Sequence, residues 1–343
     1  MKAVSISRHG GPEVLEFGER PTPEPARGEI RVRVKACALN HLDLWVRQGL
    51  PGIEIPLPHI LGSDIAGVVD KLGKSVTHPK IGTPVIITPG IGCGKCRYCV
   101  SGWTSLCDQF TIMGFRKDGG YAEYVVVGAK SVVPVSSRYS FEAWAATPLV
   151  FLTVYHMLVT RAGLKRGETV LIHATGSGIG SAAIQLAKHL GARVITTAGT
   201  DEKLAKGKKL GAWGLINYRK TDFAEEVKRL TKGKGAEVVF EHIGPETWTG
   251  SLASLAKGGR LVTCGATSGP KAEIDLRFLF MKQLSLLGSY MGGDGELRKV
   301  MHLISQGKLK PVVDTIFPLE EARQAHQKME SRDFFGKIVL TLP

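Results

Sequence analysis

The middle of the chain runs Thr169-Val170-Leu171-Ile172-His173-Ala174-Thr175-Gly176-Ser177-Gly178-Ile179-Gly180-Ser181. Its first five residues have the short apolar pattern of a buried strand, and glycine then occupies every second position from 176 to 180. Such glycines permit a tight turn, let the backbone approach a pyrophosphate, and let helix and strand pack closely. A helix that begins at this loop adds free N–H groups and a favourable dipole for phosphate. We therefore predict a dinucleotide site at Gly176, Ser177, Gly178, Ile179 and Gly180, with a plain structural turn as the alternative.

The residues on either side support this prediction because strand and helix patterns alternate for about 120 residues. Strands are expected at 169–173, 193–197, 214–217, 236–241, 259–264 and 284–289, and helices at 181–190, 201–210, 223–231 and 248–255. This alternation is typical of a doubly wound parallel sheet. We predict a Rossmann coenzyme domain over residues 151–290.

The first 150 residues have a different character. Short strand patterns separated by Gly and Pro lie at 30–34, 65–69, 83–87 and 121–127, which predicts an all-β barrel or sandwich. Residues 291–343 contain helix patterns at 296–305 and 319–329, an extended segment at 312–318 and a final strand at 337–342. We expect this C-terminal part to return to the first domain, so that the chain is an α/β protein of two domains.

The composition is that of a globular protein and argues against membrane and nucleic-acid partners. The chain has 343 residues, 43% hydrophobic and 22% charged, and no unbroken apolar run of the roughly 18 residues that a membrane span needs. Its start carries no secretory pattern, so a cytoplasmic location is expected by default. The formal charge of +14 would suit a polyanion, but Lys and Arg are scattered and not interleaved with aromatics. We therefore expect neither a membrane nor a nucleic-acid partner.

Four of the six cysteines crowd into Cys93, Cys96, Cys99 and Cys107, a C-x2-C-x2-C-x7-C spacing. Four thiolates so close together can surround one zinc ion with no open position, which makes such a site structural. An iron–sulfur cluster is the rival, but the seven-residue gap and the absence of Pro after Cys107 disfavour it. The lobe 93–107 is therefore predicted to hold one structural Zn²⁺.

The end of the second Rossmann strand bears on the choice of coenzyme. NAD sites usually place Asp or Glu there, about 20 residues after the glycine loop, to bind the ribose hydroxyls. This chain has Ala198-Gly199-Thr200, and Asp201 follows in a helix N-cap context. Lys203 and Arg219 are nearby cations. We expect NADP(H) to be favoured over NAD(H).

With these motifs in this order, nearly the whole chain resembles a medium-chain dehydrogenase/reductase, with a GroES-like catalytic domain, a Rossmann domain and a C-terminal return. The segments Ala38-Leu39-Asn40-His41-Leu42-Asp43 and Gly62-Ser63-Asp64-Ile65-Ala66-Gly67 fall where zinc alcohol dehydrogenases carry catalytic ligands. Those enzymes have Cys in place of Asn40, His-Glu in place of Ser63-Asp64, and a third ligand near Val150 or Phe151. The departures resemble the quinone oxidoreductase branch, which reduces enones and quinones without a metal, although a four-cysteine lobe is unusual there.

The resemblance also implies roles for individual residues. Asn40, Asp43, Asp64 and Thr153 are expected at the catalytic centre, and Thr153 also at the nicotinamide. His41 would contact the coenzyme pyrophosphate. Further coenzyme contacts are expected from Gly199, Thr200, Lys203, Tyr218, Cys264, Gly265, Gly288 and Ser289. Trp45 and Phe151 are candidates for an apolar pocket or for the core, whereas His156, His173 and His242 fit core or surface histidines better than catalytic ones. The family implies a homodimer or homotetramer.

The expected reaction is hydride transfer from NADPH to the β-carbon of a conjugated carbonyl, with the Asn40 amide as hydrogen-bond donor to the carbonyl oxygen. A small carbonyl compound, enone, quinone or alcohol is the expected substrate. One rival is an alcohol dehydrogenase whose zinc is held by His41, Asp43, His59 or Asp64. The other is a non-catalytic protein that binds coenzyme or RNA.

Overall fold

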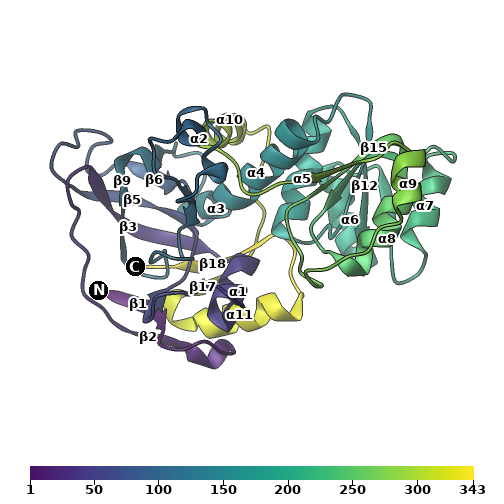
Figure 1. The fold of residues 1–343 in the computed structure, drawn as a ribbon. Helices are drawn as coiled ribbons and strands as arrows, with labels where there is room; N and C mark the ends of the chain where they lie inside the picture. Colours follow the sequence, from purple (N-terminus) through teal and green to yellow (C-terminus); the bar gives the residue numbers. More distant parts are fainter. The chain divides into compact units, whose positions relative to one another are not determined.

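The computed structural model describes residues 1–343, which form two compact units (Figure 1). The first unit contains Met1–Val150, Gly292–Gly307 and Pro311–Pro343, and the second contains Phe151–Met291 with Lys308–Lys310. Both are built as expected, a β-rich unit and a unit with a parallel sheet.

The first unit is organised around a seven-stranded sheet in the order β10-β6-β5-β3-β18-β17, with β9 also paired to β3. Along β3 buried residues alternate with more exposed ones, which is the pattern of a strand with one face on a core. The strands of this sheet are β3 (Glu29–Ala38), β5 (Asp64–Leu72), β6 (Pro84–Ile87), β9 (Tyr124–Gly128), β10 (Val132–Pro134), β17 (Val313–Pro318) and β18 (Lys337–Thr341).

Smaller elements complete this unit. A three-stranded sheet joins β2 (Leu15–Glu19), β1 (Lys2–Ile6) and β4 (His59–Ile60), and a two-stranded one joins β7 (Gly90–Ile91) and β8 (Thr111–Ile112). The helices are α1 (His41–Gln48), α2 (Arg97–Val100), α3 (Phe141–Ala145), α10 (Asp294–Ser305) and α11 (Ala322–Ser331), and α4 (Pro148–Tyr155) begins here and continues into the second unit.

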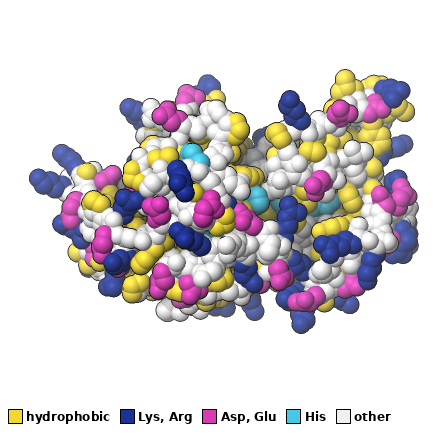
Figure 2. All heavy atoms as spheres, turned by 90° about the horizontal axis from the view of Figure 1, so that it is seen from below, with side chains coloured by type: hydrophobic (Ala, Val, Ile, Leu, Met, Phe, Trp, Pro, Cys, Tyr) yellow, Lys and Arg dark blue, Asp and Glu magenta, His cyan; other side chains and the backbone are white.

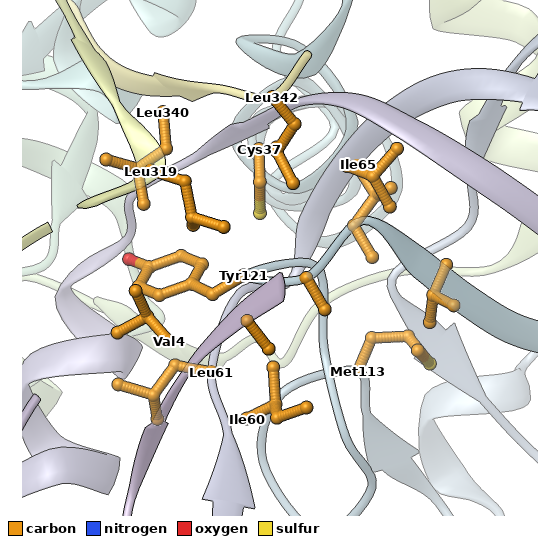
Figure 3. Close-up of a cluster of buried hydrophobic side chains, with 14 of the residues drawn as sticks. Val4, Cys37, Ile60, Leu61, Ile65, Met113, Tyr121, Leu319, Leu340 and Leu342 are labelled. Carbon is orange, nitrogen blue, oxygen red and sulfur yellow. The ribbon is translucent and has the colours of Figure 1, made fainter. Parts of the chain in front are cut away.

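Strands from both ends of the chain share one core. Figure 3 shows Val4, Cys37 and Tyr121 packed with Leu340 and Leu342 near the C-terminus, and all five belong to one cluster of buried side chains. The backbone explains this proximity, because β18 runs antiparallel to β3 with Val339 opposite Ala38. The first residue of β18 is therefore brought to the end of β3, where the Asn40 motif begins.

The second unit is a six-stranded parallel sheet in the order β13-β12-β11-β14-β15-β16. Helices α5 and α6 pack together, as do α7 and α8, so the sheet is doubly wound. The strands are β11 (Thr169–Ile172), β12 (Arg193–Ala198), β13 (Gly214–Asn217), β14 (Ala236–Glu241), β15 (Leu255–Thr263) and β16 (Ser285–Gly288). The helices are α5 (Gly178–His189), α6 (Asp201–Leu210), α7 (Phe223–Leu230), α8 (Pro245–Ala253) and α9 (Leu276–Met281).

Two helices of the second unit begin three residues earlier than the sequence pattern predicts. Helix α8 begins at Pro245 rather than Trp248, because proline is well suited to a first helical position whose N–H has no partner. Helix α5 begins at Gly178 rather than Ser181, because the Ser177 side chain caps it by accepting a hydrogen bond from Gly180 N at 2.9 Å. The glycine loop thus forms the first helical turn.

One helical segment, Phe141–Arg161, is long and apolar enough to cross a membrane by length and composition alone. In the structure 72% of its most apolar 18-residue stretch is buried inside the protein, and the core helix of a soluble protein passes the same test. The segment is not a single regular helix, since it comprises α3, α4 and a π-helical turn over His156–Arg161. The basic side chains are spread over the face in Figure 2 without forming one patch.

Candidate functional site

The glycine loop has the geometry that a bound phosphate needs. A Cβ on Gly180 would collide with the carbonyl oxygen of Ala174, so only glycine lets the helix start so close to the preceding strand. Ser177 fixes the turn by donating to Ala174 O at 2.9 Å. Thr175 anchors its base by donating to Thr197 O at 2.8 Å. The first turn of α5, with its free backbone N–H groups, can therefore receive a pyrophosphate.

Polar and charged side chains surround the end of β12, where the adenosine ribose is expected. A Cβ on Gly199 would lie 2.8 Å from the Tyr218 hydroxyl and 3.1 Å from Arg219 Nε, so both side chains lie over this glycine. Thr200 caps α6 by accepting a hydrogen bond from Lys203 N at 3.3 Å. Asp201 accepts a hydrogen bond from Asn217 Nδ2 at 2.7 Å and pairs with Lys220. The Asp201 carboxylate is thus engaged by neighbours within its own unit.

The expected nicotinamide contacts follow the neighbouring strands of the same sheet. A Cβ on Gly265 would lie 2.8 Å from His242 O, which shows how closely the loops after β14 and β15 approach. The Ser289 hydroxyl is buried after β16 and has no hydrogen-bond partner. Thr153 Oγ1 lies 4.0 Å from Met291 Sδ within the same unit. An unpartnered hydroxyl and two closely packed loops fit a polar ligand such as a carboxamide.

In the first unit Asn40, Asp64 and Lys337 form a buried cluster. Lys337 Nζ donates to Asn40 Oδ1 at 2.6 Å and to Asp64 Oδ2 at 2.9 Å, and Asn40 Nδ2 donates to the same Asp64 oxygen at 3.0 Å. The Lys337 side chain is 5% exposed and that of Asp64 0%. The second Asp64 oxygen accepts a hydrogen bond from Leu149 N at 2.7 Å. The charged Nζ of Lys337 thus lies between the side chains of Asn40 and Asp64.

Sequence reasoning did not predict Lys337 as a site residue. It is 297 residues from Asn40 in the chain and reaches it because β18 pairs with β3, which also pairs with β5, the strand that begins at Asp64. The available signal was a lysine directly before three apolar residues in the C-terminal strand, where a buried charge needs a partner.

The structure places Asp43 as a link between the two sequence motifs. Its carboxylate accepts hydrogen bonds from Asn40 N at 2.7 Å and from Gly62 N at 3.1 Å. Burial raises the pKa of Asp43 to about 7, although these two N–H groups and Lys337 act in the opposite direction. Asp43 therefore positions the chain around Asn40 through backbone contacts.

The residues considered for a displaced metal site, His41, Asp43, His59 and Asp64, do not form a group that could hold one metal ion. His59 Nε2 lies 3.1 Å from Gly114 O, and Ser63 donates to Met113 O at 2.7 Å. His41 packs edge-on against Trp45, with ring centroids 4.9 Å apart, and its pKa is lowered mainly by burial. Phe151 is buried in the core.

A second buried network in this unit was also not predicted. Arg47 is 0% exposed, and its Nη1 lies 3.1 Å from His326 Nδ1, while His326 Nε2 lies 3.1 Å from the Tyr121 hydroxyl. Because arginine can only donate, His326 Nδ1 accepts and its Nε2 carries the proton. Burial lowers the pKa of His326 to about 3, and Arg47 adds to this, so the ring is neutral. Together with the Arg47–Glu330 ion pair, the network ties α1 to α11.

The four cysteines of the lobe are brought together as a possible metal centre. Cys93, Cys96, Cys99 and Cys107 have sulfur atoms that all lie within 4.8 Å of one another. The Sγ atoms of Cys93 and Cys99 are 4.0 Å apart, close to the roughly 3.8 Å edge of a tetrahedral zinc–thiolate site. Backbone N–H groups of Cys96 and Cys93 point at Cys93 Sγ and Cys107 Sγ at 3.3 and 3.4 Å, as suits thiolates. This donor set fits Zn²⁺.

Comparisons with known proteins agree with the two-unit architecture. Residues 26–137 match the alcohol dehydrogenase GroES-like domain, and residues 178–306 match the zinc-binding dehydrogenase domain. The chain is 34% identical to quinone oxidoreductase 1 of Escherichia coli over 98% of each protein, and 33% identical to an alcohol dehydrogenase of Geobacillus stearothermophilus over 99% of each. A solved structure of an NAD-dependent alcohol dehydrogenase superposes with a TM-score of 0.97 at 46% identity, covering 100% of both chains.

The matches place a GroES-like domain before a coenzyme domain and extend over the whole chain. The relatives are oxidoreductases of both the quinone and the alcohol type. The chain therefore belongs to the medium-chain dehydrogenase/reductase family and is an NAD(P)-dependent oxidoreductase.

Proposed function

We propose that this enzyme uses NADPH to reduce an activated C=C bond or a quinone, without a catalytic zinc. The observation that supports this most is the contact of Lys337 Nζ with Asn40 and Asp64 at 2.6 and 2.9 Å. Oxidation of an unactivated alcohol requires loss of a hydroxyl proton, which zinc promotes by stabilising the alkoxide. An enone or quinone is already polarised for hydride attack and needs only a hydrogen-bond donor at its oxygen.

The bound coenzyme supplies the hydride, and the protein supplies position and charge stabilisation. Lys337 has three N–H bonds, of which two are directed at Asn40 and Asp64. Its third N–H is the donor we assign to the substrate oxygen, where negative charge develops as the hydride reaches the β-carbon. Solvent then protonates the α-carbon.

The Asn40 amide, the donor suggested by sequence, has a different part in this scheme. One Nδ2 hydrogen is directed at Asp64 at 3.0 Å, and the other faces Ala38 O at 3.5 Å, a long contact. Asn40 and Asp64 thus hold the ammonium in place. The Nδ2 hydrogen that faces Ala38 O is only weakly bound, so Asn40 is a second candidate hydrogen-bond donor to the substrate oxygen.

We further propose a preference for NADP(H). The support is local to the end of β12, where Arg219 Nε and the Tyr218 hydroxyl lie over Gly199 while Asp201 is paired with Lys220. A guanidinium there suits a 2′-phosphate, whereas a ribose hydroxyl would need a free carboxylate. The solved relative described as NAD-dependent makes a direct comparison of the two coenzymes informative.

We propose that the protein works as a homo-oligomer joined through β16. This strand ends the parallel sheet and pairs on one side only, with β15. The surface beside it is apolar, because Leu286, Tyr290 and the α9 residues Leu276, Phe280 and Met281 are between 37% and 72% exposed. An unpaired edge with apolar side chains is suited to pair with the same strand of a second copy. Leu286→Lys should then yield monomers in sedimentation, and an unchanged oligomer would exclude this interface.

The proposed reaction is tested by a turnover screen. NADPH and NADH are each offered with enones, quinones and aldehydes, and the oxidised coenzymes with alcohols, for wild type and Lys337→Met. Lys71→Met is the control, because Lys71 is an exposed lysine on β5 that pairs with Glu24. We expect enone or quinone reduction in wild type and the control, and a loss of kcat of at least tenfold in Lys337→Met. Alcohol oxidation as the best activity, insensitive to Lys337→Met, would contradict the proposal.

A further inference from the structure

Glu241, the last residue of β14, is a buried acid to which neither the sequence motifs nor the proposed reaction assigns a role. Its side chain is 0% exposed. Three successive backbone N–H groups, those of His242, Ile243 and Gly244, donate to Oε1 at 2.9, 2.7 and 3.3 Å. The Ser251 hydroxyl donates to Oε2 at 2.6 Å, and that of Thr247 lies 2.9–3.0 Å from both oxygens. Five donors around one carboxyl group are the surroundings of an ionised carboxylate.

The basic side chain beside this network, His173, contacts the carboxylate mainly through Ser251. Ser251 uses its proton on Glu241, so the contact of 2.9 Å between His173 Nε2 and Ser251 Oγ requires Nε2–H to donate. His173 Nδ1 lies 3.1 Å from Thr197 Oγ1. Burial lowers the pKa of His173, although the charge of Glu241 acts in the opposite direction. Burial disfavours the charged ring, so these contacts fit the Nε2–H tautomer, whose Nε2 lies 3.8 Å from the carboxylate.

The position of Glu241 in the sheet brings this charge to the coenzyme edge. In the order β13-β12-β11-β14-β15-β16, the strand order reverses between β11 and β14. Doubly wound sheets bind their ligands outside the carboxyl ends of the strands at this reversal. Strand β11 leads into the glycine loop, and Glu241 O accepts from Cys264 N at 3.3 Å on the other side. Burial raises the pKa of Cys264 to about 12, and the charge of Glu241 adds to this, so its field reaches the loop after β15.

We infer that Glu241 sets the balance between oxidised and reduced coenzyme on the enzyme. The nicotinamide ring is cationic when oxidised and neutral when reduced, so a buried negative charge at this edge stabilises the oxidised form selectively. The inference rests on the proposed function in one respect, that the nicotinamide lies beside the Cys264–Gly265 loop. Glu241 does not touch the reacting atoms in this scheme and acts through its charge.

The expected effect is large enough to measure. Two unit charges up to roughly 12 Å apart, at an effective dielectric constant of about 20, interact by an amount that corresponds to about tenfold or more in affinity. Removal of the charge should therefore raise the ratio Kd(oxidised)/Kd(reduced) about tenfold. For a two-electron couple, tenfold corresponds to a change of about 30 mV in the potential of the bound coenzyme.

The test measures Kd for NADP+, NADPH, NAD+ and NADH by fluorescence titration of wild type, Glu241→Gln and Glu241→Asp. We expect the ratio to rise about tenfold in Glu241→Gln and to stay near the wild-type value in Glu241→Asp, which keeps the charge. The matched control is Glu237→Gln, on the same strand but about 13 Å away near its other end, where Glu237 accepts from Thr169 N at 2.6 Å. This control should leave the ratio unchanged.

A third variant keeps the proposal falsifiable where Glu241→Gln does not fold. Thr247→Val removes one hydrogen-bond donor from the Glu241 carboxylate but leaves its negative charge. Fewer donors then counteract this charge, so the ratio Kd(oxidised)/Kd(reduced) should fall below the wild-type value. Equal losses of affinity for oxidised and reduced coenzyme in these variants would overturn the inference. Glu241 would then serve only to hold the backbone of residues 242–244 in place. A preference for NAD(H) would contradict the proposed coenzyme but not this ratio. Failure of wild type to bind either coenzyme would overturn both.

Discussion

Replacement of Lys337 by methionine removes the cation from the Asn40–Asp64–Lys337 cluster while keeping most of the side-chain volume. Asp64 is then left as a charged group that is 0% exposed, with only neutral donors, Leu149 N and the Asn40 amide. Two hydrogen bonds from the ammonium are lost, each worth about 1.5–3 kcal/mol when a charge is involved. Breaking a buried ion pair by removing one partner costs about 3–5 kcal/mol, in agreement with that sum.

The assay is urea denaturation followed by circular dichroism, with the free energy of unfolding obtained from the midpoint and slope. Lys337→Met should lose about 3–5 kcal/mol, and Lys71→Met, which breaks an exposed pair, less than about 1 kcal/mol. Combining Lys337→Met with Asp64→Asn removes both charges and should give a protein more stable than Lys337→Met alone. A loss below about 1 kcal/mol for Lys337→Met, or additive losses in the double variant, would refute the buried-charge reasoning.

Three further predictions concern the metal, the coenzyme and pH. Cys96→Ser should lower the melting temperature and the zinc content while NADPH affinity is kept, because a closed site contributes to folding and not to chemistry; full zinc retention would argue against the lobe as the site. Arg219→Ala should weaken NADPH binding about tenfold and NADH binding little, unlike the exposed control Arg229→Ala; equal effects on both coenzymes would remove Arg219 from phosphate recognition. The pKa of Asp43 is about 7 in the folded protein and 3.8 for an ordinary aspartate. The protonated side chain therefore contributes fully to folding stability below about pH 3.8, and this contribution is lost as the pH rises to about 7. Relative to Asp43→Asn, wild type should therefore lose stability over this range, on the order of 4 kcal/mol, in urea titrations between pH 4 and 7.5, whereas parallel curves would contradict the raised pKa.

Much of the fold could be predicted because its signals are local. The strand Gly214–Asn217 and the helix Asp201–Leu210 have the predicted bounds, since periodicity and capping are carried by adjacent residues. The start of α8 was predicted three residues late, at Trp248, whereas Pro245 occupies the first helical position. The glycine loop and the cysteine lobe were visible for the same reason, as each lies within a short segment.

The residues that were missed depend on contacts between distant segments. Lys337 is 273 residues from Asp64, and their contact follows only once the register of β18 on β3 is known. The Arg47–His326 contact spans 279 residues and likewise requires α1 and α11 to lie together. Glu241 appears in the sequence as an ordinary strand residue, and its burial with five donors emerges from the packing of α8 on β14. Single residues without a local motif cannot be assigned a role from periodicity.

The central claim is that Lys337, and not a metal ion, serves the catalytic centre. The most direct measurement is zinc content and turnover on the same sample, before and after dialysis against a chelator that removes loosely bound metal. We predict one zinc per chain that remains after dialysis and is lost in Cys96→Ser, with NADPH-dependent enone or quinone reduction unchanged by the chelator. A second zinc whose removal abolishes turnover and whose return restores it, in wild type but not in Asp64→Asn, would contradict the claim.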